Sequence, residues 1–346
     1  MKIDEITVFE DFLCLFVIMI HTVSVCITNY VKPGIISSLF YIFSRFLTFA
    51  VLAFLFSSGL KALYKYKNCV GQFNYAGFIL DRVKKIYVPY VICVILYYLY
   101  FVFRLNYFPF EISELFRYIF YGNLSAHFYF IVVIMQFYLL MPLWHLICTK
   151  IPFSLSFFAA LLITYITRLC LVDVFPGFMY FDRIFPYYSV FWVTGCYAGY
   201  NYDRFTEIIS KYKSAVYLSA LLVTSHVFLQ YLNFCNIIVY KYREYVHVIF
   251  CLVFTVAFYL LVTDSIVLFK KLMPVLKKTS AITFYIYLIH VLVIFECNYL
   301  MDSLQIISTT QRFLIRTFFA YTISFTSSSI YVSAKKKIKI GVLYKL

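Results

Sequence analysis

The stretch DFLCLFVIMIHTVSVCITNY, from Asp11 to Tyr30, is apolar almost throughout, yet it carries one ionisable residue, His21, near its middle. An α-helix rises about 1.5 Å per residue, so a stretch of about twenty residues spans a hydrocarbon core of about 30 Å. An ionisable side chain near the centre of a bilayer is costly and marks a functional site by default. We therefore interpret this stretch as a transmembrane helix with a functional histidine.

Glu10 lies eleven residues before His21, at the mouth of the same helix. Eleven steps of about 100° return to within about 20° of the starting direction, so both side chains share one face of the helix. Small or polar residues follow the same face, namely Cys14, Val17, Ser24 and Thr28. We expect this face to point into the protein interior.

The composition extends the membrane interpretation to the whole chain. The 346 residues are 64% hydrophobic and 13% charged, with a mean hydropathy of +0.88, which is more apolar than a soluble domain of this length. We predict an all-α, polytopic membrane protein with one domain, residues 1–346, and about ten transmembrane helices. The predicted spans are 11–31, 39–61, 86–103, 127–147, 152–171, 185–201, 214–234, 246–268, 281–300 and 313–334.

The basic residues predict the orientation of these spans. The formal net charge is +15, but the basic residues are scattered between apolar stretches, which favours topology determinants over a nucleic-acid site. Twenty of the 30 Lys and Arg residues fall in one set of alternate loops, together with both ends of the chain. Both termini are therefore predicted to be cytoplasmic. The expected partner is the lipid bilayer, and no nucleic acid is expected.

Several familiar active sites are missing from the sequence. The ten cysteines form no CxxC pair and have no metal-ligand spacing, so we expect them to pack as small apolar residues and predict no bound metal. The chain also lacks a Walker loop, a GxSxG motif and an HExxH motif. These absences exclude the commonest ATP-driven, serine-hydrolase and zinc-protease chemistries.

A basic turn precedes the third predicted span, in DRVKKIYVPY, residues 81–90. Arg82 and Lys85 lie three residues apart, about one helical turn, so both cationic groups can meet one anionic group. The alternative is that these residues only anchor the cytoplasmic end of the span.

Two later spans carry polar residues at other depths. His127 is expected at the outer edge of the fourth span, with Tyr129 after it and Gln136 deep inside, where an amide needs a polar partner. His290 lies near the middle of the ninth span. The alternatives are an interfacial anchor for His127 and a buried structural histidine for His290. Ionisable groups at three depths suit the passage of a group from a cytoplasmic donor to an outward-facing acceptor.

Five stretches, in this order, resemble motifs of the acyltransferase-3 family of integral-membrane acyltransferases, and the resemblance covers nearly the whole chain. The matching positions are His21 in the first span; Ser58 and Gly59 in FLFSSGL; Arg82, Lys85, Pro89 and Tyr90 in RVKKIYVPY; His127 and Gln136 in HFYFIVVIMQFYLLMPL; and Tyr287 and His290 in ITFYIYLIH. Within the family, DRVKKIYVPY, YFIVVIMQF and GCYAGYNYDRF look most like a member described as a poly-N-acetylglucosamine exporter or its O-succinyltransferase.

The resemblance implies a membrane O-acyltransferase of the bacterial plasma membrane. Its co-substrate would be acyl-CoA, either acetyl-CoA or succinyl-CoA, with no bound cofactor. Its acceptor would be a hydroxyl of a surface or capsular polysaccharide or of a lipid-linked glycan, and glycan synthase machinery is a further candidate partner. His21 would be the general base, because an imidazole takes up a proton near neutral pH, and His127 a second base or a relay. Arg82 and Lys85 would hold the donor phosphates, and Glu10 would belong to the same donor-binding site. Tyr129, Gln136, Tyr287, His290 and Ser58 would support the site.

The chain departs from the family pattern at two of these positions. Glu10 stands where the family has an arginine, which replaces a cation expected near the acyl-CoA phosphates by a carboxylate, and Tyr129 replaces a tryptophan. The change at Glu10 favours an alternative function, a polysaccharide translocator with a degenerate acyltransferase site. A third interpretation, a structural subunit of a glycan synthase complex, gives no role to the histidines within the spans.

Overall fold

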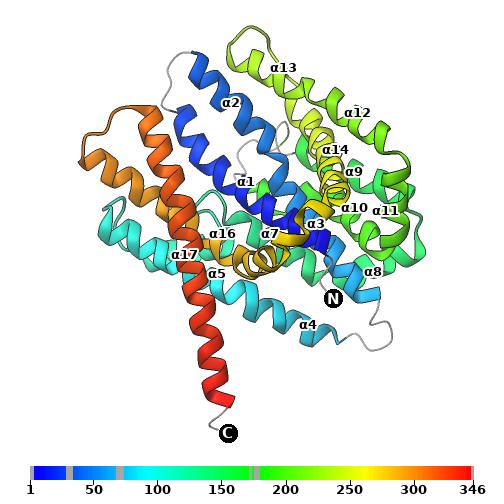
Figure 1. Ribbon diagram of the computed structural model, residues 1–346, viewed down its shortest axis with the longest axis horizontal. Coiled ribbons are helices and arrows are strands. Elements are labelled where there is room, and N and C mark those ends of the chain that lie inside the picture. Colours follow the sequence, from blue (N-terminus) through cyan, green and yellow to red (C-terminus); the bar gives the residue numbers. More distant parts are fainter. Residues whose placement is uncertain (1–3, 29–33, 68–73, 171–173, 175–179, 344–346) are drawn as a thin grey trace. The chain divides into compact units, whose positions relative to one another are not determined.

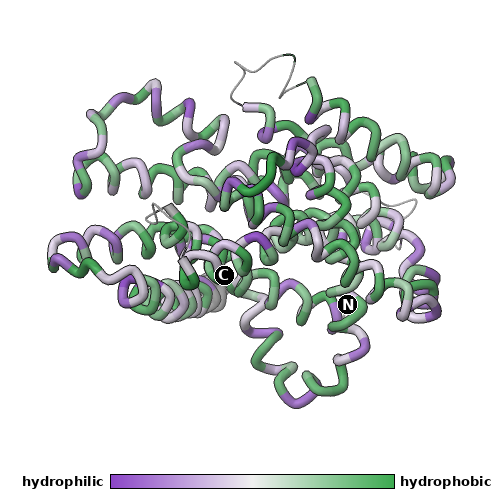
Figure 2. Tube along the Cα trace, turned by 90° about the horizontal axis from the view of Figure 1, so that it is seen from above, coloured by the Kyte–Doolittle hydropathy of each residue, from purple (hydrophilic) through white to green (hydrophobic). Residues whose placement is uncertain are grey.

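The computed structural model describes residues 4–28, 34–67, 74–170, 174 and 180–343, and this part of the chain is helical without a strand (Figure 1). The all-α prediction is therefore confirmed. Apolar residues line most of the helical stretches (Figure 2). Six helical segments of the described chain are long and apolar enough to cross a membrane: Asp4–Ile27, Ile35–Lys67, Tyr75–Arg104, Lys213–Phe234, Arg243–Asp264 and Ile266–Ser303.

A seventh span results if α7 (Tyr129–Leu139) and α8 (Met141–Lys150) are counted as one, although they meet at an angle of 60°. Pro142 explains the bend, because proline is compatible with the first turn of α8 but not with the interior of one continuous helix. The predicted spans 152–171, 185–201 and 313–334 correspond to helices that are shorter or more polar than the six. Ten spans and cytoplasmic termini remain predictions.

The chain forms two compact units. The first comprises Met1–Ala50, Leu222–Lys241 and Ala257–Leu346, and the second comprises Val51–Leu221 and Tyr242–Val256. The first contains α1 (Asp4–Thr28), α2 (Ile35–Leu47), α13 (Ser225–Phe234), α15 (Ile266–Phe269), α16 (Met273–Ser303) and α17 (Thr309–Leu343). The second contains α4 (Tyr75–Arg82), α5 (Val88–Leu99), α6 (Ile112–Tyr121), α7, α8, α9 (Phe153–Leu169), α10 (Ser189–Tyr200) and α11 (Tyr202–Lys211). The unit boundary falls within α3 (Phe49–Lys67), α12 (Lys213–Val223) and α14 (Arg243–Asp264).

In the first unit, α1 and α16 run side by side in the same direction (Figure 1). Three contacts establish their register along the length of both helices. Asp4 forms an ion pair of 2.8 Å with Lys277, and the Thr283 hydroxyl donates a hydrogen bond of 3.3 Å to Asp11. Further along, the His21 ring lies against the His290 ring.

The third helix of this group, α17, runs in the opposite direction and packs on both α1 and α16. The Tyr321 hydroxyl donates a hydrogen bond of 2.6 Å to the carbonyl oxygen of Leu15. One turn earlier in α17, Arg316 contacts Cys26, near the other end of α1. Phe9, Phe16 and Phe49 pack around Phe258, which adds an aromatic cluster beside this three-helix group.

In the second unit, α3 and α10 cross at close range because glycine faces backbone at the crossing. A side chain at Gly195 would overlap the carbonyl oxygen of Phe56, and one at Gly199 would overlap that of Leu60. The two glycines form a GxxxG pattern, which allows two helices in a membrane to approach closely. Gly59 completes the crossing, because a side chain there would meet the carbonyl oxygen of Trp192 at 2.7 Å.

This crossing predicts that Gly199→Ala destabilises the protein, since the added Cβ forces two helix backbones apart. We expect a loss of about 1–3 kcal/mol in stability, the usual range for overpacking. The loss of stability is measured by heating purified protein in detergent and monitoring the folded fraction by size-exclusion chromatography. Gly34→Ala is the matched control, because a Cβ at Gly34 meets nothing closer than the Ser37 hydroxyl at 3.9 Å. Equal melting temperatures for the two variants would contradict the packing argument.

Candidate active site

The first unit brings two of the predicted site residues together, His21 of α1 and His290 of α16. Their ring centroids lie 5.1 Å apart, with an angle of 55° between the ring planes. The His290 side chain is 0% exposed, whereas His21 is half-buried. Of the two imidazoles, His21 is therefore the one that is partly exposed.

Contacts with backbone carbonyl groups determine which ring nitrogen of His290 carries the hydrogen. Its Nδ1 lies 2.8 Å from the carbonyl oxygen of Tyr287 and 3.2 Å from that of Ile286. A carbonyl oxygen only accepts hydrogen bonds, so Nδ1 carries the hydrogen and a neutral ring has its lone pair on Nε2. Tyr287 thus contributes its backbone to the orientation of the His290 ring, in addition to a ring contact at 6.1 Å.

The beginning of α1 carries two carboxylates with different surroundings. Glu10 is half-buried, whereas Asp11 is buried and accepts the hydrogen bond from Thr283 of α16. Cys14 and Val17, on the face shared by Glu10 and His21, are buried as the helical periodicity indicates. The side chain of Thr28 lies outside the described residues. Asp11 is the acidic residue that sequence reasoning missed.

Arg82, in the second unit, lies against two aromatic rings. Its guanidinium carbon is 4.9 Å from the ring centroid of Phe78 and 4.9 Å from that of Tyr138. The side chain is half-buried, and its Nε has no hydrogen-bond partner. The two ring centroids lie only 5.8 Å from each other, so the rings do not lie on opposite faces of the guanidinium. Their cation–π contacts leave its N–H groups for an anion.

Lys85 has different surroundings from Arg82, although the two share one basic turn. Its ammonium forms a 2.5 Å ion pair with Asp81, and its side chain is 67% exposed. A π-helical turn from Val83 to Tyr87 separates α4 from α5, so the two cations do not lie on a regular α-helix. Such turns are frequent at functional sites.

His127 lies just before α7 and is buried, also in the second unit. Its Nδ1 is 3.1 Å from the Ser125 hydroxyl, and its ring contacts Tyr97 and Phe128 at centroid distances of 5.9 Å and 4.2 Å. The His127 side chain is thus packed among aromatic rings and has a polar partner in Ser125. Its catalytic role remains a prediction.

Gln136 binds the backbone of the segment that precedes α10. Its Nε2 donates a 2.6 Å hydrogen bond to the carbonyl oxygen of Arg183, and its Oε1 accepts one of 3.0 Å from the amide of Phe185. The amide of this span therefore has the partner that its depth requires. Tyr129 lies against the same segment, with the Arg183 guanidinium 5.0 Å from its ring centroid and the Tyr188 ring 6.1 Å away.

The same segment carries one perturbed carboxyl. Arg183 donates a 2.5 Å hydrogen bond to Asp182. Burial nevertheless raises the pKa of the Asp182 carboxyl above its usual value, since the opposing effect of Arg183 is smaller.

Two other positions of the family motifs have structural surroundings in the second unit. Tyr90 is 0% exposed, and its hydroxyl donates a 2.9 Å hydrogen bond to the carbonyl oxygen of Ile119, which ties α5 to α6. Ser58 is half-buried and immediately precedes Gly59 at the crossing of α3 with α10. Both observations favour packing roles for these positions.

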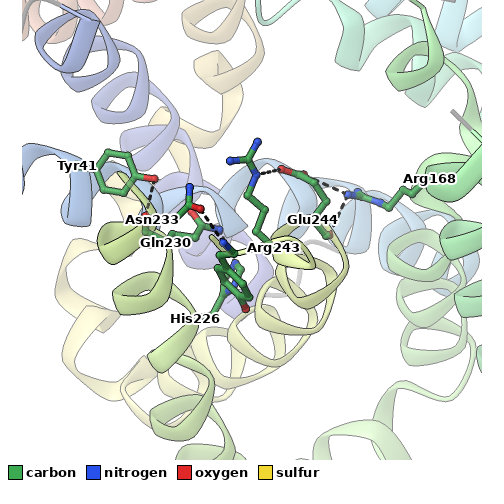
Figure 3. Close-up of polar contacts among 8 residues, drawn as sticks. Tyr41, Arg168, His226, Gln230, Asn233, Arg243 and Glu244 are labelled. Carbon is green, nitrogen blue, oxygen red and sulfur yellow. Dashed lines mark hydrogen bonds and ion pairs between the residues drawn. The ribbon is translucent and has the colours of Figure 1, made fainter. Parts of the chain in front are cut away.

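Figure 3 shows two further polar groups, one in each unit. In the first unit, the Gln230 amide nitrogen donates to Nε2 of His226 at 2.5 Å, and the Tyr41 hydroxyl donates to the carbonyl oxygen of Gln230 at 3.2 Å. In the second, the buried Arg168 contacts Glu244 at 3.9 Å. These contacts give polar residues within helices partners inside the protein.

The predicted site residues are thus divided between the units. His21, His290, Tyr287 and Glu10 belong to the first unit, and the others belong to the second: Ser58, Arg82, Lys85, His127, Tyr129 and Gln136. Within the described ranges, no three His, Cys, Asp or Glu side chains are grouped as a metal site requires.

Comparison with known families identifies the class of the protein. Residues 8–333 match the acyltransferase-3 family, described as an acyltransferase domain. The chain belongs to the acyltransferase-3 family. The match covers residues of both units, so this membrane protein is an acyltransferase in general class. Comparison with curated proteins and with solved structures found no match, so the closer likeness to a poly-N-acetylglucosamine exporter or O-succinyltransferase remains a prediction.

The Gln136 contacts predict that Gln136→Leu loosens the segment from Tyr180 to Tyr188, because two backbone groups lose their partner. An unsatisfied buried group costs about 1–3 kcal/mol, so local opening should become at least about fivefold more frequent. Limited trypsin digestion, read by mass spectrometry as cleavage after Arg183, measures this opening. Gln311→Leu is the control, because Gln311 is exposed. Unchanged cleavage at Arg183 would contradict the role of Gln136.

Proposed function

We propose that this protein is an O-acyltransferase that moves an acetyl or succinyl group from acyl-CoA to a hydroxyl of a bacterial surface polysaccharide or lipid-linked glycan. The observation that carries the proposal is the His21–His290 pair within a span of a chain that belongs to the acyltransferase-3 family. The plasma membrane would be its location.

His21 acts as the general base in this proposal. A sugar hydroxyl is a poor nucleophile at neutral pH, so a base must remove its proton as the oxygen attacks the thioester carbonyl carbon. The tetrahedral intermediate then collapses with loss of the CoA thiolate, which takes the proton back from the imidazolium. One C–S bond breaks, one C–O bond forms, and the products are an ester and free CoA.

His290 positions His21 rather than contacting the substrate, because it is fully buried and its ring lies against the His21 ring. Its Nδ1–H is committed to the backbone, so its lone pair on Nε2 is held in one direction. A fixed acceptor beside the base favours one orientation of the His21 ring.

Arg82 is proposed to bind a phosphate of the acyl-CoA donor. Its edge carries N–H groups in a fork that matches an oxyanion, and two aromatic rings hold the plane of the guanidinium. Lys85 contributes less, because its ammonium is already paired with Asp81. His127 remains a proposed second base or relay.

Glu10 supports a second candidate, a translocator of a surface polysaccharide in which the acyltransferase site is degenerate. A carboxylate at the position of the family arginine repels the donor phosphates. The location of polymer in a deletion strain separates the candidates. Surface polymer without its ester indicates the transferase, and unacylated polymer retained inside the cell indicates the translocator.

The general-base role predicts that His21→Ala lowers acyl transfer by about 10²–10⁴-fold, the usual contribution of general acid–base catalysis. The O-acyl content of the glycan, measured by NMR in cells that express each variant at the same level, tests this expectation. His145→Ala is the matched control, because His145 is also a half-buried histidine on a helix but packs against the rings of Tyr66 and Tyr200. Acylation that is unchanged in His21→Ala would refute the assignment.

The donor role predicts that Arg82→Gln raises the KM for acyl-CoA about tenfold while kcat changes less than twofold. The lost contact is a charge-assisted hydrogen bond to a phosphate far from the reacting carbonyl, worth about 1.5–3 kcal/mol. CoA release from purified protein, followed with a thiol reagent, gives both constants. For Lys85→Gln we expect less than a threefold increase in KM. The exposed Lys150 provides the control variant, Lys150→Gln. A fall in kcat alone for Arg82→Gln would argue against donor binding.

A further inference from the structure

Arg316 of α17 is enclosed in the first unit, with 0% of its side chain exposed. Its Nη1 donates a 2.8 Å hydrogen bond to the side-chain oxygen of Asn298 in α16. Its Nη2 lies 2.9 Å from the Sγ of Cys26 in α1. The guanidinium of α17 thus contacts the two helices, α1 and α16, that carry the histidine pair.

No carboxylate neutralises this cation: within the described chain, none lies at ion-pair distance from Arg316, and its Nε has no hydrogen-bond partner. Its two partners are a neutral amide and a thiol. One turn earlier, Arg312 does have a carboxylate partner, Asp302, at 2.6 Å. A buried guanidinium without a counterion is unfavourable, and in a membrane protein such a group marks a functional site by default.

The position of Arg316 relates it to the histidine pair. Cys26 lies five residues after His21, and Asn298 lies eight residues after His290, on two helices that run in the same direction. At about 1.5 Å per residue, the guanidinium contacts lie about 7–12 Å further along this helix pair. A group that reacts at His21 and carries a charge within this distance would place the charge beside Arg316.

We propose that Arg316 binds an oxyanion, carboxylate or phosphate, that belongs to a substrate of the acyl transfer. This inference rests on the proposed function, since it assigns a binding residue within the same unit as His21. A neutral thiol is a weak hydrogen-bond acceptor, so an incoming oxyanion replaces Cys26 at Nη2 and also satisfies the free Nε–H. The oxyanion has two sources of the same chemistry: the free carboxylate of a dicarboxylic acyl group, or the phosphate of a lipid-linked acceptor.

Matched pairs of probes test the proposal on the full-length protein in lipid nanodiscs. The first pair is succinyl-CoA and acetyl-CoA, which differ in the acyl carboxylate. The second is decaprenyl phosphate and decaprenol, which differ in the phosphate. We expect the charged member of at least one pair to bind wild type more tightly than its neutral counterpart. Arg316→Gln should raise the Kd of that charged probe at least tenfold. The Kd of the neutral probe should change less than twofold.

The controls separate binding from a purely structural role. Arg312→Gln should retain the preference for the charged probe, since Arg312 is paired with Asp302. Cys26→Ala should retain or strengthen it, whereas a clamp that only holds three helices together would be weakened by this change. If Arg316→Gln does not fold, Arg316→Lys replaces it. Lysine keeps the positive charge but lacks the forked N–H groups of the guanidinium, so it should reduce the preference for the charged probe selectively.

Two results would overturn the proposal. One is a wild type that binds both members of each pair equally, and the other is an Arg316 variant that weakens charged and neutral probes alike. A failure of the proposed function is distinguishable from these results. In that case wild type releases no CoA in the presence of donor and glycan, while the selective binding of a charged probe and its loss in Arg316→Gln persist.

Discussion

The structure depends on one constraint, that polar groups within apolar spans must find their partners inside the protein. The α1–α16–α17 group satisfies it repeatedly. Asp11 receives a hydrogen bond from Thr283, His21 faces His290, and Arg316 reaches Asn298. These contacts set the register of the three helices, because apolar contacts alone do not select one register between helices in lipid. The polar residues that fix the register of these helices are therefore also the residues available for chemistry.

The second unit satisfies the same constraint with backbone groups. Gln136 bonds both a carbonyl and an amide of the segment before α10, and Tyr90 bonds a carbonyl of α6. Glycine contributes differently at the crossing of α3 with α10, where the backbones approach because no side chain intervenes. Some residues of the family motifs thus make packing contacts. A motif match alone therefore does not identify a catalytic residue.

The helical class and the two central histidines could be predicted from the sequence, because apolar length and an isolated ionisable residue are local signals. The contact between His21 and His290 could not, since they are 269 residues apart and neither span encodes its neighbour. Arg316 lies inside RFLIRTFFAYTISF, where a basic residue between apolar neighbours fits a topology determinant as well as a buried group, and only its contacts with Cys26 and Asn298 separate the two. Asp11 stands at the start of an apolar stretch, where the sequence does not distinguish an exposed carboxylate from a buried one.

The polar contacts between α1 and α16 lie in a row along the two helices. Successive pairs, Asp4 with Lys277, Asp11 with Thr283 and His21 with His290, are offset by nearly the same number of residues, so they follow one another along the seam between two helices. Arg316 joins that seam beyond the histidines through Cys26 and Asn298. Within the described residues, no carboxylate lies at ion-pair distance from Arg316 at this end, whereas at the other end Lys277 pairs with Asp4. A substrate that supplies a negative charge beyond His21 would therefore complete the pattern, and the position of this charge would fix the reacting carbonyl relative to the base.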